Sequence, residues 1–435
     1  MSIVHFSRCV FTACACAAVI AGCGGGQQTA FAPPGAPAQS GSQPASRSVA
    51  PLRVAHYYLV ALRGLGGSNG SFANGITDRS WVAGGSYLRG NSANHAAIWI
   101  NGTPNDLGTL GGPNSGIYWP VKSDTGWVDG VSDTAQSDPN AENFCGDNGP
   151  ICLGFRWKSN TMTPLATLGG NNSYAAGVND RGQASGLAET STADASCAAP
   201  QVLDYYAVIW KTNGKIVTLP PIAGDSVSQA AAINNQGQAA GASGACGPPL
   251  SLGYGDTHAV LWTGGSPMDL GSLGGTNFNA GTAVNDHGQV AGVSGLSGNT
   301  TYHAFFWQKG TMTDLGVLPG DVNSTAFGIN NKGQVVGQSC DASNNCRAFI
   351  WQKGSMIDLN LLVHAGRLYL TYGGDINDSG QITGNAVNTK TGRSPAFVAT
   401  PSGTTTVRGY SAAPRVILPE RVRKLFAQHR LRPIR

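Results

Sequence analysis

Short apolar runs separated by polar turns fill the chain between about residues 57 and 401. The stretch from Leu315 to Leu359 shows the pattern most clearly, with β-prone runs at 326–329, 334–337, 347–351 and 355–359. Asn, Lys and Gly stand between the first two runs, where Asn supports a turn through its own side chain and Gly supplies a positive φ. This alternation predicts four short antiparallel strands joined by hairpins, rather than helices.

The four-strand unit recurs, and each copy carries the phrase Ile-Asn-(Asp/Asn)-x-Gly-Gln-x-x-Gly or a variant of it. The seven closing glycines are Gly84, Gly130, Gly186, Gly241, Gly292, Gly337 and Gly384, spaced by 45 to 56 residues. The first two copies, which end at Gly84 and Gly130, are eroded. Repeats of ~40–50 residues are typical of propeller blades. We therefore predict an all-β fold, a β-propeller of seven four-stranded antiparallel blades.

The two ends of the repeat region complement each other. The seventh copy ends at Phe397-Val398-Ala399 without a fourth strand, and the run from Tyr57 to Leu62 precedes the first copy like a fourth strand without the other three. The N-terminal strand is therefore expected to pair into the last blade and remove an unpaired sheet edge. Six or eight blades, or an open array, are the competing architectures.

One aromatic residue marks the third strand of nearly every copy. It is Trp99, Trp157, Trp210, Trp262, Trp307 and Trp351, with Ala399 at the seventh place. A large aromatic side chain that recurs once per unit favours packing between blades over ligand stacking. His95, His258 and His303 share a place in this strand where other copies have Arg347 or Pro395, so we interpret them as structural.

Several strings in the later copies resemble the HAF-type extracellular repeat family. They include His303-Ala304-Phe305-Phe306-Trp307, the phrase from Gly328 to Gln334, and a closing copy from Asp358 to Pro401. The resemblance covers about residues 57–401, and the first two copies depart from it in their turns. It implies a bacterial secreted or surface protein with a propeller fold, and no established general activity.

The first 23 residues have the features of an export signal. Arg8 provides a positive start, and the apolar stretch from Cys9 to Ile20 is too short to span a bilayer, which needs ~20 apolar residues. Ile20-Ala21-Gly22-Cys23 resembles the lipobox of bacterial lipoproteins, which implies lipid attachment at Cys23; an ordinary cleaved signal is the alternative. Residues 24–52 have the Gly/Pro/Ser composition of a disordered tether, residues 53–401 form the predicted propeller, and residues 402–435 are a basic tail.

The net charge of +4 is a property of the tail. The chain from Arg408 to its end holds eight Lys and Arg and one Glu, whereas residues 53–401 hold 17 basic and 22 acidic residues. This distribution gives no support for nucleic-acid binding. Residues 419–429 could form a short amphipathic helix that contacts an anionic membrane surface, with a disordered extension as the alternative.

Six cysteines remain in the predicted body. We expect Cys340 to pair with Cys346 and Cys145 with Cys152 as local loop bridges, which leaves Cys197 and Cys246 in corresponding loops of adjacent repeats. An even number in an exported body indicates disulfides, although six cysteines allow 15 connectivities. Their spacing does not match zinc sites, and no metal or cofactor is predicted.

Long loops between the second and third strands of blades 2, 3 and 4 are the candidate ligand face. Elaboration of one face on a regular scaffold is a common way to build a binding site. The candidate carboxylates in these loops are Glu142, Asp147, Asp194, Asp204 and Asp256, and Asp225 and Asp321 are expected at crossings between blades on the same face. Ordinary solvated loops are the alternative interpretation.

Gly-x-Ser-x-Gly occurs nowhere between a strand and a helix, and the body has no P-loop and no His-Glu-x-x-His, so no catalytic residue is assigned. His364, Arg367, Tyr369 and Tyr372 break the repeat pattern before the last copy, so they are the positions that a hydrolase or lyase would use. We predict a lipid-anchored propeller of the bacterial envelope, on the outer membrane, that binds a protein or glycan without catalysis. The alternatives are an envelope hydrolase or lyase and a purely structural surface protein.

Overall fold

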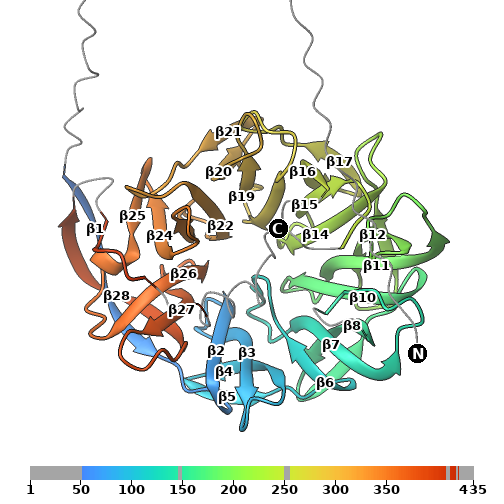
Figure 1. The fold of residues 1–435 in the computed structure, drawn as a ribbon, viewed down its shortest axis with the longest axis horizontal. Coiled ribbons are helices and arrows are strands. Elements are labelled where there is room, and N and C mark those ends of the chain that lie inside the picture. Colours follow the sequence, from blue (N-terminus) through green and yellow to red (C-terminus); the bar gives the residue numbers. More distant parts are fainter. Residues whose placement is uncertain (1–50, 146–148, 249–254, 408–411, 418–419, 421–435) are drawn as a thin grey trace, which may run out of the picture. The chain divides into compact units, whose positions relative to one another are not determined.

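The protein is described here by a computed structural model that covers residues 51–145, 149–248, 255–407, 412–417 and 420. Seven four-stranded antiparallel sheets are arranged in a ring (Figure 1). The predicted all-β class, the number of blades and the number of strands in each blade are confirmed. The signal segment, Cys23 and nearly all of the predicted tether and tail helix lie outside the described residues.

Blades 1 to 6 contribute their strands in chain order from the centre outward, and in blade 7 the N-terminal strand β1 takes the outermost place. Blade 1 consists of β2 (Gly66–Ile76), β3 (Val82–Leu88), β4 (Asn94–Ile100) and β5 (Thr103–Asp106). Blade 2 consists of β6 (Gly111–Gly116), β7 (Val128–Ser137), β8 (Pro150–Lys158) and β9 (Thr161–Pro164). Blade 3 consists of β10 (Gly169–Val178), β11 (Ala184–Ala193), β12 (Leu203–Trp210) and β13 (Ile216–Leu219). Blade 4 consists of β14 (Val227–Ile233), β15 (Ala239–Gly244), β16 (Asp256–Thr263) and β17 (Ser266–Asp269).

The remaining blades follow the same order. Blade 5 consists of β18 (Ala280–Val284), β19 (Val290–Gly295), β20 (Tyr302–Gln308) and β21 (Thr311–Asp314). Blade 6 consists of β22 (Asn323–Ile329), β23 (Val335–Cys340), β24 (Cys346–Gln352) and β25 (Ser355–Asp358), followed by the 3₁₀ turn η1 (Leu359–Leu361). Blade 7 consists of β26 (Leu368–Ile376), β27 (Ile382–Asn388), β28 (Ala396–Val407) and β1 (Leu52–Ala61).

Blade 7 closes the ring as predicted. Strand β1 pairs antiparallel with β28, from Leu52 opposite Val407 to Ala61 opposite Phe397. Figure 1 shows this blue strand lying beside the red end of the repeat region. The pairing gives the seventh sheet its fourth strand, so the outermost position of the last blade is filled by the start of the chain.

The closing glycine of each repeat lets the two innermost strands of a blade approach closely. A Cβ on Gly241 would lie 1.9 Å from the carbonyl oxygen of Gln229 on β14. At the other six closing glycines a Cβ would lie 1.9 to 2.4 Å from a carbonyl oxygen of the neighbouring inner strand. Since no Cβ fits at such a distance, the glycine in this phrase is a packing requirement rather than a turn signal.

The repeated tryptophan packs against the preceding blade, which confirms the prediction. Trp262 of blade 4 lies in one cluster with Ala207 and Ile209 of blade 3, and its indole nitrogen donates to the carbonyl of Pro220, 2.7 Å away. Trp99 and Trp210 donate in the same way to the crossing that leads into their own blades. The tryptophan therefore fixes both the packing of adjacent blades and the chain that joins them.

Candidate functional site

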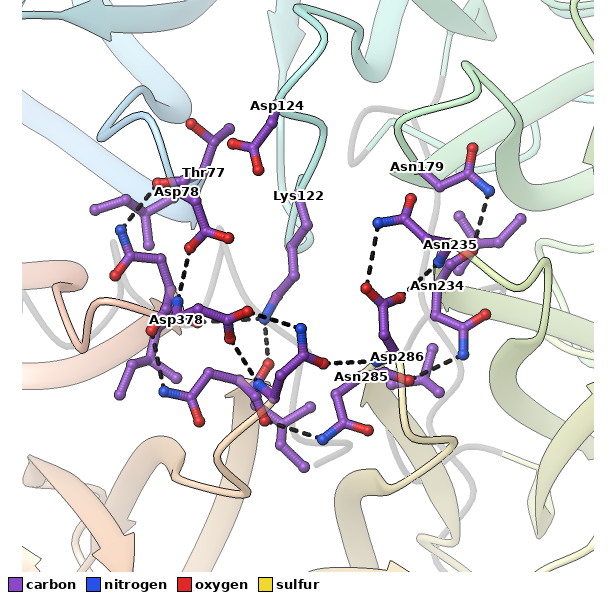
Figure 2. Close-up of a pocket in the computed structure, with 18 residues that line it drawn as sticks. Thr77, Asp78, Lys122, Asp124, Asn179, Asn234, Asn235, Asn285, Asp286 and Asp378 are labelled. Atoms are coloured by element: carbon purple, nitrogen blue, oxygen red, sulfur yellow. Dashed lines mark hydrogen bonds between the residues drawn. The ribbon is translucent and has the colours of Figure 1, made fainter.

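The repeated Asn-(Asp/Asn) dipeptides converge on the central axis of the ring. They line a small pocket of about 60 Å³, together with the last residues of the innermost strands of blades 1, 4, 5, 6 and 7 (Figure 2). Each dipeptide lies in the turn between the first and second strands of its blade, so all seven turns meet at one mouth of the central channel.

In blades 3 to 7 the first residue of the dipeptide is Asn, and its side chain connects each of these blades to the next. The side-chain oxygen of Asn234 accepts hydrogen bonds from the backbone N–H groups of Gln236 and Gln238, which holds its own turn. Its amide nitrogen donates to the carbonyl of Asn285 in the next blade, 2.9 Å away. Asn179, Asn285, Asn330 and Asn377 make the same contact to the blade that follows. One side chain thus serves both the turn and the blade interface.

The second residue of the dipeptide forms a complete ring of hydrogen bonds. Its carboxylate or amide oxygen accepts the backbone N–H of the preceding blade's turn. The seven acceptors are Asp78, Asp124, Asp180, Asn235, Asp286, Asn331 and Asp378. Asn235 also donates to the carboxylates of Asp180 and Asp286, so the amides offset part of the carboxylate charge.

Among the described residues that line this pocket, Lys122 is the one cation, and it stands where the other copies have Ile or Val. Its ammonium crosses the channel from blade 2, donates to the carbonyls of Ile329 and Ile376, and lies 3.1 Å from the carboxylate of Asp375 (Figure 2). Burial raises the pKa of Asp375 to about 6, and the charge of Lys122 opposes that rise. The departure of the second repeat from the common phrase therefore introduces a lysine whose ammonium connects blade 2 to blades 6 and 7.

The opposite face carries the predicted ligand residues, and three of the seven carboxylates are buried. Glu142, in the long loop of blade 2, is 1% exposed and accepts the N–H groups of Val202 and Leu203 from the loop of blade 3, at 2.8 and 2.7 Å. Asp256 accepts from the amide of Gln229 at 2.7 Å. These oxygen atoms join loops and strands to one another.

Glu142 is also part of a buried carboxylate pair that the sequence did not indicate. The amide nitrogen of Gln201 donates to Glu142 and to Glu189, at 3.0 and 3.1 Å. Burial, and then the nearby charge of Glu142, raises the pKa of Glu189 to about 8. Burial and the neighbouring charge of Glu142 therefore favour the protonated form of Glu189.

Asp321, the third buried carboxylate of the set, belongs to an ionic cluster of blade 6. Arg347 lies 2.9 Å from one of its oxygens, and Arg415 of the tail contacts the other. Arg415 also lies 2.8 Å from the carboxylate of Asp341. Residues 413–416 of the tail thus lie against blades 6 and 7, where Val416 packs on Tyr369.

Of the remaining predicted ligand residues, Asp194, Asp204 and Asp225 are partly exposed, and Asp147 lies outside the described residues. Asp225 accepts from His258 at 2.8 Å, so this histidine has a carboxylate partner, as His95 and His303 do. Asp194 and Asp204 share a hydrogen bond at the surface of the blade 3 loop. The ligand role of the seven stays a prediction.

Three disulfides hold the loops of this face, with the predicted pairings. Cys145 pairs with Cys152, Cys340 with Cys346, and Cys197 of blade 3 with Cys246 of blade 4. Asp204 lies near the sulfur atoms of the third pair, but those sulfurs are bonded to each other and offer no thiolate to a metal. Disulfides are compatible with an exported protein.

Three of the four residues suggested for catalysis, His364, Tyr369 and Tyr372, have separate partners. His364 packs against His56, with ring centroids 4.7 Å apart. Tyr369 is buried against Val416, and the hydroxyl of Tyr372 donates to Asn74 in blade 1. These contacts are made with different parts of the protein, so they do not bring the side chains together at one site.

A larger cleft lies at the seam between blades 7 and 1, and sequence reasoning did not identify it. Its volume is about 550 Å³, and Arg63, Gly67, Asn388 and Arg393 are among the lining residues. The signal in the sequence is the glycine-rich stretch after Arg63, together with two arginines at positions that carry none in the other repeats.

The sequence matches no protein-family model and no curated protein. Among solved structures it is similar to an oligogalacturonate lyase in complex with manganese, at 11% identity and a TM-score of 0.45, covering 86% of this chain and 99% of that one. It is also similar to the β-propeller domain of the Trilobed protease from Pyrococcus furiosus, at 12% identity and a TM-score of 0.42, covering 66% and 80%.

A third similar structure is a puromycin-hydrolyzing peptidase of Mycobacterium tuberculosis, at 11% identity and a TM-score of 0.44. The match covers 82% of this chain and spans only 57% of the peptidase. Similarity at these levels concerns the propeller fold and carries no information about activity. Within the described ranges, no helix has the length and apolar character needed to cross a membrane.

Proposed function

We propose that this protein is a lipid-anchored propeller of the bacterial envelope that binds a protein or glycan through the loops of blades 2 to 4, without catalysis. The observation that carries the proposal is the bracing of these loops to one another. Glu142 links the loops of blades 2 and 3 through two backbone N–H groups, and the Cys197–Cys246 disulfide links those of blades 3 and 4.

Bracing of this kind favours recognition. Loops that are fixed before binding lose little conformational entropy when a partner docks, so more of the contact energy appears as affinity. Asp194 and Asp204 lie on this braced surface and remain accessible enough to contact a partner. The buried carboxylates hold the surface in place.

Two features of the sequence support the proposed location. The string Ile20-Ala21-Gly22-Cys23 resembles a lipobox, and the Gly/Pro/Ser composition of residues 24–52 is typical of a tether. The resemblance to HAF-type repeats agrees with a secreted or surface protein. Replacement of Cys23 by Ala is expected to release the protein from the membrane fraction of cells, and unchanged membrane association would refute the anchor.

Affinity capture from envelope extract tests the binding function. The full-length chain, with its disulfides intact, is the bait, and mass spectrometry identifies the retained protein or glycan. The Asp194→Asn/Asp204→Asn variant is expected to lose that partner, whereas Asp314→Asn, which removes a partly exposed carboxylate from blade 5, keeps it. Equal retention by both variants would contradict the role of the blade 2 to 4 loops.

The same experiment examines the alternative of a hydrolase or lyase. If extract components are cleaved and the His364→Ala/Arg367→Ala variant stops the cleavage, the protein is an enzyme and the proposal is wrong. If nothing is retained and nothing is cleaved, the structural interpretation replaces the proposal.

A further inference from the structure

The seam cleft between blades 7 and 1 has an unusual charge for this protein. Arg63, on the crossing from β1 to β2, and Arg393, in the loop between β27 and β28, both line it. Among the described residues that line the cleft, none is Asp or Glu. The cleft is therefore a local basic site on a propeller body in which acidic residues outnumber basic ones.

Both arginines are specific to the seam. The place of Arg63 in the repeat is taken by Gly108, Ala166, Pro220, Gly271 and Gly316 in blades 2 to 6. The place of Arg393 is taken by Asp204, Asp256, Thr301 and Asn345 in blades 3 to 6. A property that only the seam has cannot be a requirement of the blade, because the other blades fold without it.

The main chain at both arginines is anchored, while their guanidinium groups have no partner. The carbonyl of Arg63 accepts from the indole of Trp99 at 2.6 Å, and the carbonyl of Arg393 accepts from the backbone N–H of Asn388 at 2.9 Å. In the part of the chain that the structure describes, no hydrogen bond or ion pair engages either guanidinium. Arg347 and Arg415, by contrast, are each paired with carboxylates.

The glycine-rich start of β2 forms part of the cleft wall. A Cβ on Gly70 would lie 2.0 Å from the carbonyl of Ser394, so only glycine lets this strand reach the loop that carries Arg393. Gly66 and Gly67 also line the cleft and leave its wall without side chains. The volume of about 550 Å³ falls within the usual range for small-ligand pockets, roughly 300–1,000 Å³.

We propose that the seam cleft binds a small ligand through a carboxylate or phosphate group, which Arg63 and Arg393 hold. A guanidinium is a planar, permanently charged donor that matches both groups in geometry. The presence of two such donors in one cleft, whose described lining residues include no Asp or Glu, favours an anion over a neutral ligand. The cleft is distinct from the blade 2 to 4 loops, so this proposal does not depend on the function proposed above.

Calorimetric titration of the full-length chain tests the proposal. The probes are glucuronate, which carries a carboxylate, glucose 1-phosphate, which carries a phosphate, and glucose as the neutral control. At least one anion is expected to bind at about 10 mM or below and to bind more weakly as salt is added, while glucose does not bind. The anion that binds more tightly identifies the preferred group.

Variants connect the binding to the cleft. Arg63→Gln and Arg393→Gln are each expected to weaken anion binding about tenfold or more, the effect of losing one charge-assisted hydrogen bond. Lys215→Gln removes an exposed positive charge from blade 3 and is expected to leave binding unchanged. Both arginines are exposed, so unaltered unfolding temperatures are expected for all three variants.

Three results would overturn the proposal. They are the absence of binding by both anions at about 10 mM, equal binding of glucose, and undiminished anion binding in the Arg63→Gln/Arg393→Gln double variant. Loss of partner capture by the Asp194→Asn/Asp204→Asn variant, with anion binding intact, would show that the two sites are separate.

Discussion

At the scale of single residues, the repeated asparagine shows what the sequence predicts and what it leaves out. Its spacing from glycine indicates a turn, and Asn234 does hold such a turn through its side-chain oxygen. The hydrogen bond from its side-chain amide to the next blade could not be predicted. The partner carbonyl lies 51 residues away and is brought close only when the blades form a ring. The turn could be predicted from neighbouring residues, whereas the hydrogen bond between blades could not.

Lys122 provides a test of the central channel. Replacement of Lys122 by Met leaves the carboxylate of Asp375 buried without its cation, and we expect the free energy of unfolding to fall by about 3 kcal/mol. Denaturant titration measures the change. Lys215→Met, at an exposed site, should stay within about 0.5 kcal/mol of the wild type.

The double variant Lys122→Met/Asp375→Asn separates charge from packing. It removes the carboxylate together with the ammonium, so it is expected to be more stable than Lys122→Met alone. If the two variants are equally unstable, the ion pair is not the reason for the loss.

Glu189 gives the stability a pH dependence. Because its pKa is raised to about 8 from 4.5, the folded protein holds this proton where the unfolded chain has lost it. Its contribution to the free energy of unfolding is complete below about pH 4.5 and is lost as the pH rises to about 8. Asp129, whose pKa burial also raises to about 8, acts in the same direction.

Replacement of Glu189 by Gln is expected to remove part of this dependence. The difference in unfolding free energy between about pH 5 and about pH 8.5 should shrink by at least about 1 kcal/mol, close to the value of one pKa unit. Denaturant titrations at the two pH values measure it. An unchanged difference would mean that Glu189 is ionised in the folded protein.

At the scale of elements, the sequence predicted the strands well and the loops poorly. The alternation of apolar runs and turns placed β22 to β25 within a few residues, because each strand is defined by its own hairpin. The loops of blades 2 to 4 were expected to present carboxylates to a ligand, yet Glu142 and Asp256 are buried. Their burial depends on neighbouring blades, which no local pattern encodes.

The three disulfides should differ in their effect on stability. Cys197 and Cys246 are 49 residues apart and Cys145 and Cys152 only 7, so the first disulfide lowers the chain entropy of the unfolded state more than the second. Replacement by serine is expected to cost about 4 kcal/mol for Cys197–Cys246 and about 2 kcal/mol for Cys145–Cys152. Denaturant titration of both double variants measures the order, and a reversed order would contradict it.

At the scale of the whole molecule, seven nearly equivalent blades leave two places where the symmetry fails. One is the braced loop set of blades 2 to 4, and the other is the seam where β1 completes blade 7. Function is expected where copies differ, because a property shared by all blades serves the ring itself. The number of blades could be predicted from the repeats. The cleft at the seam could not, because it forms only when β1 pairs with the last repeat.

Closure of the ring by β1 is the claim on which both proposed sites depend, and a disulfide cross-link tests it directly. Tyr58 lies opposite Thr400 in the β1–β28 pair, whereas Thr406 lies opposite Arg53. Paired residues of antiparallel strands are close enough for a disulfide. Mass spectrometry of proteolytic peptides should therefore find a 58–400 cross-link in Tyr58→Cys/Thr400→Cys and none in Tyr58→Cys/Thr406→Cys. Absence of the first cross-link, or equal yield of both, would contradict the closed seven-bladed ring.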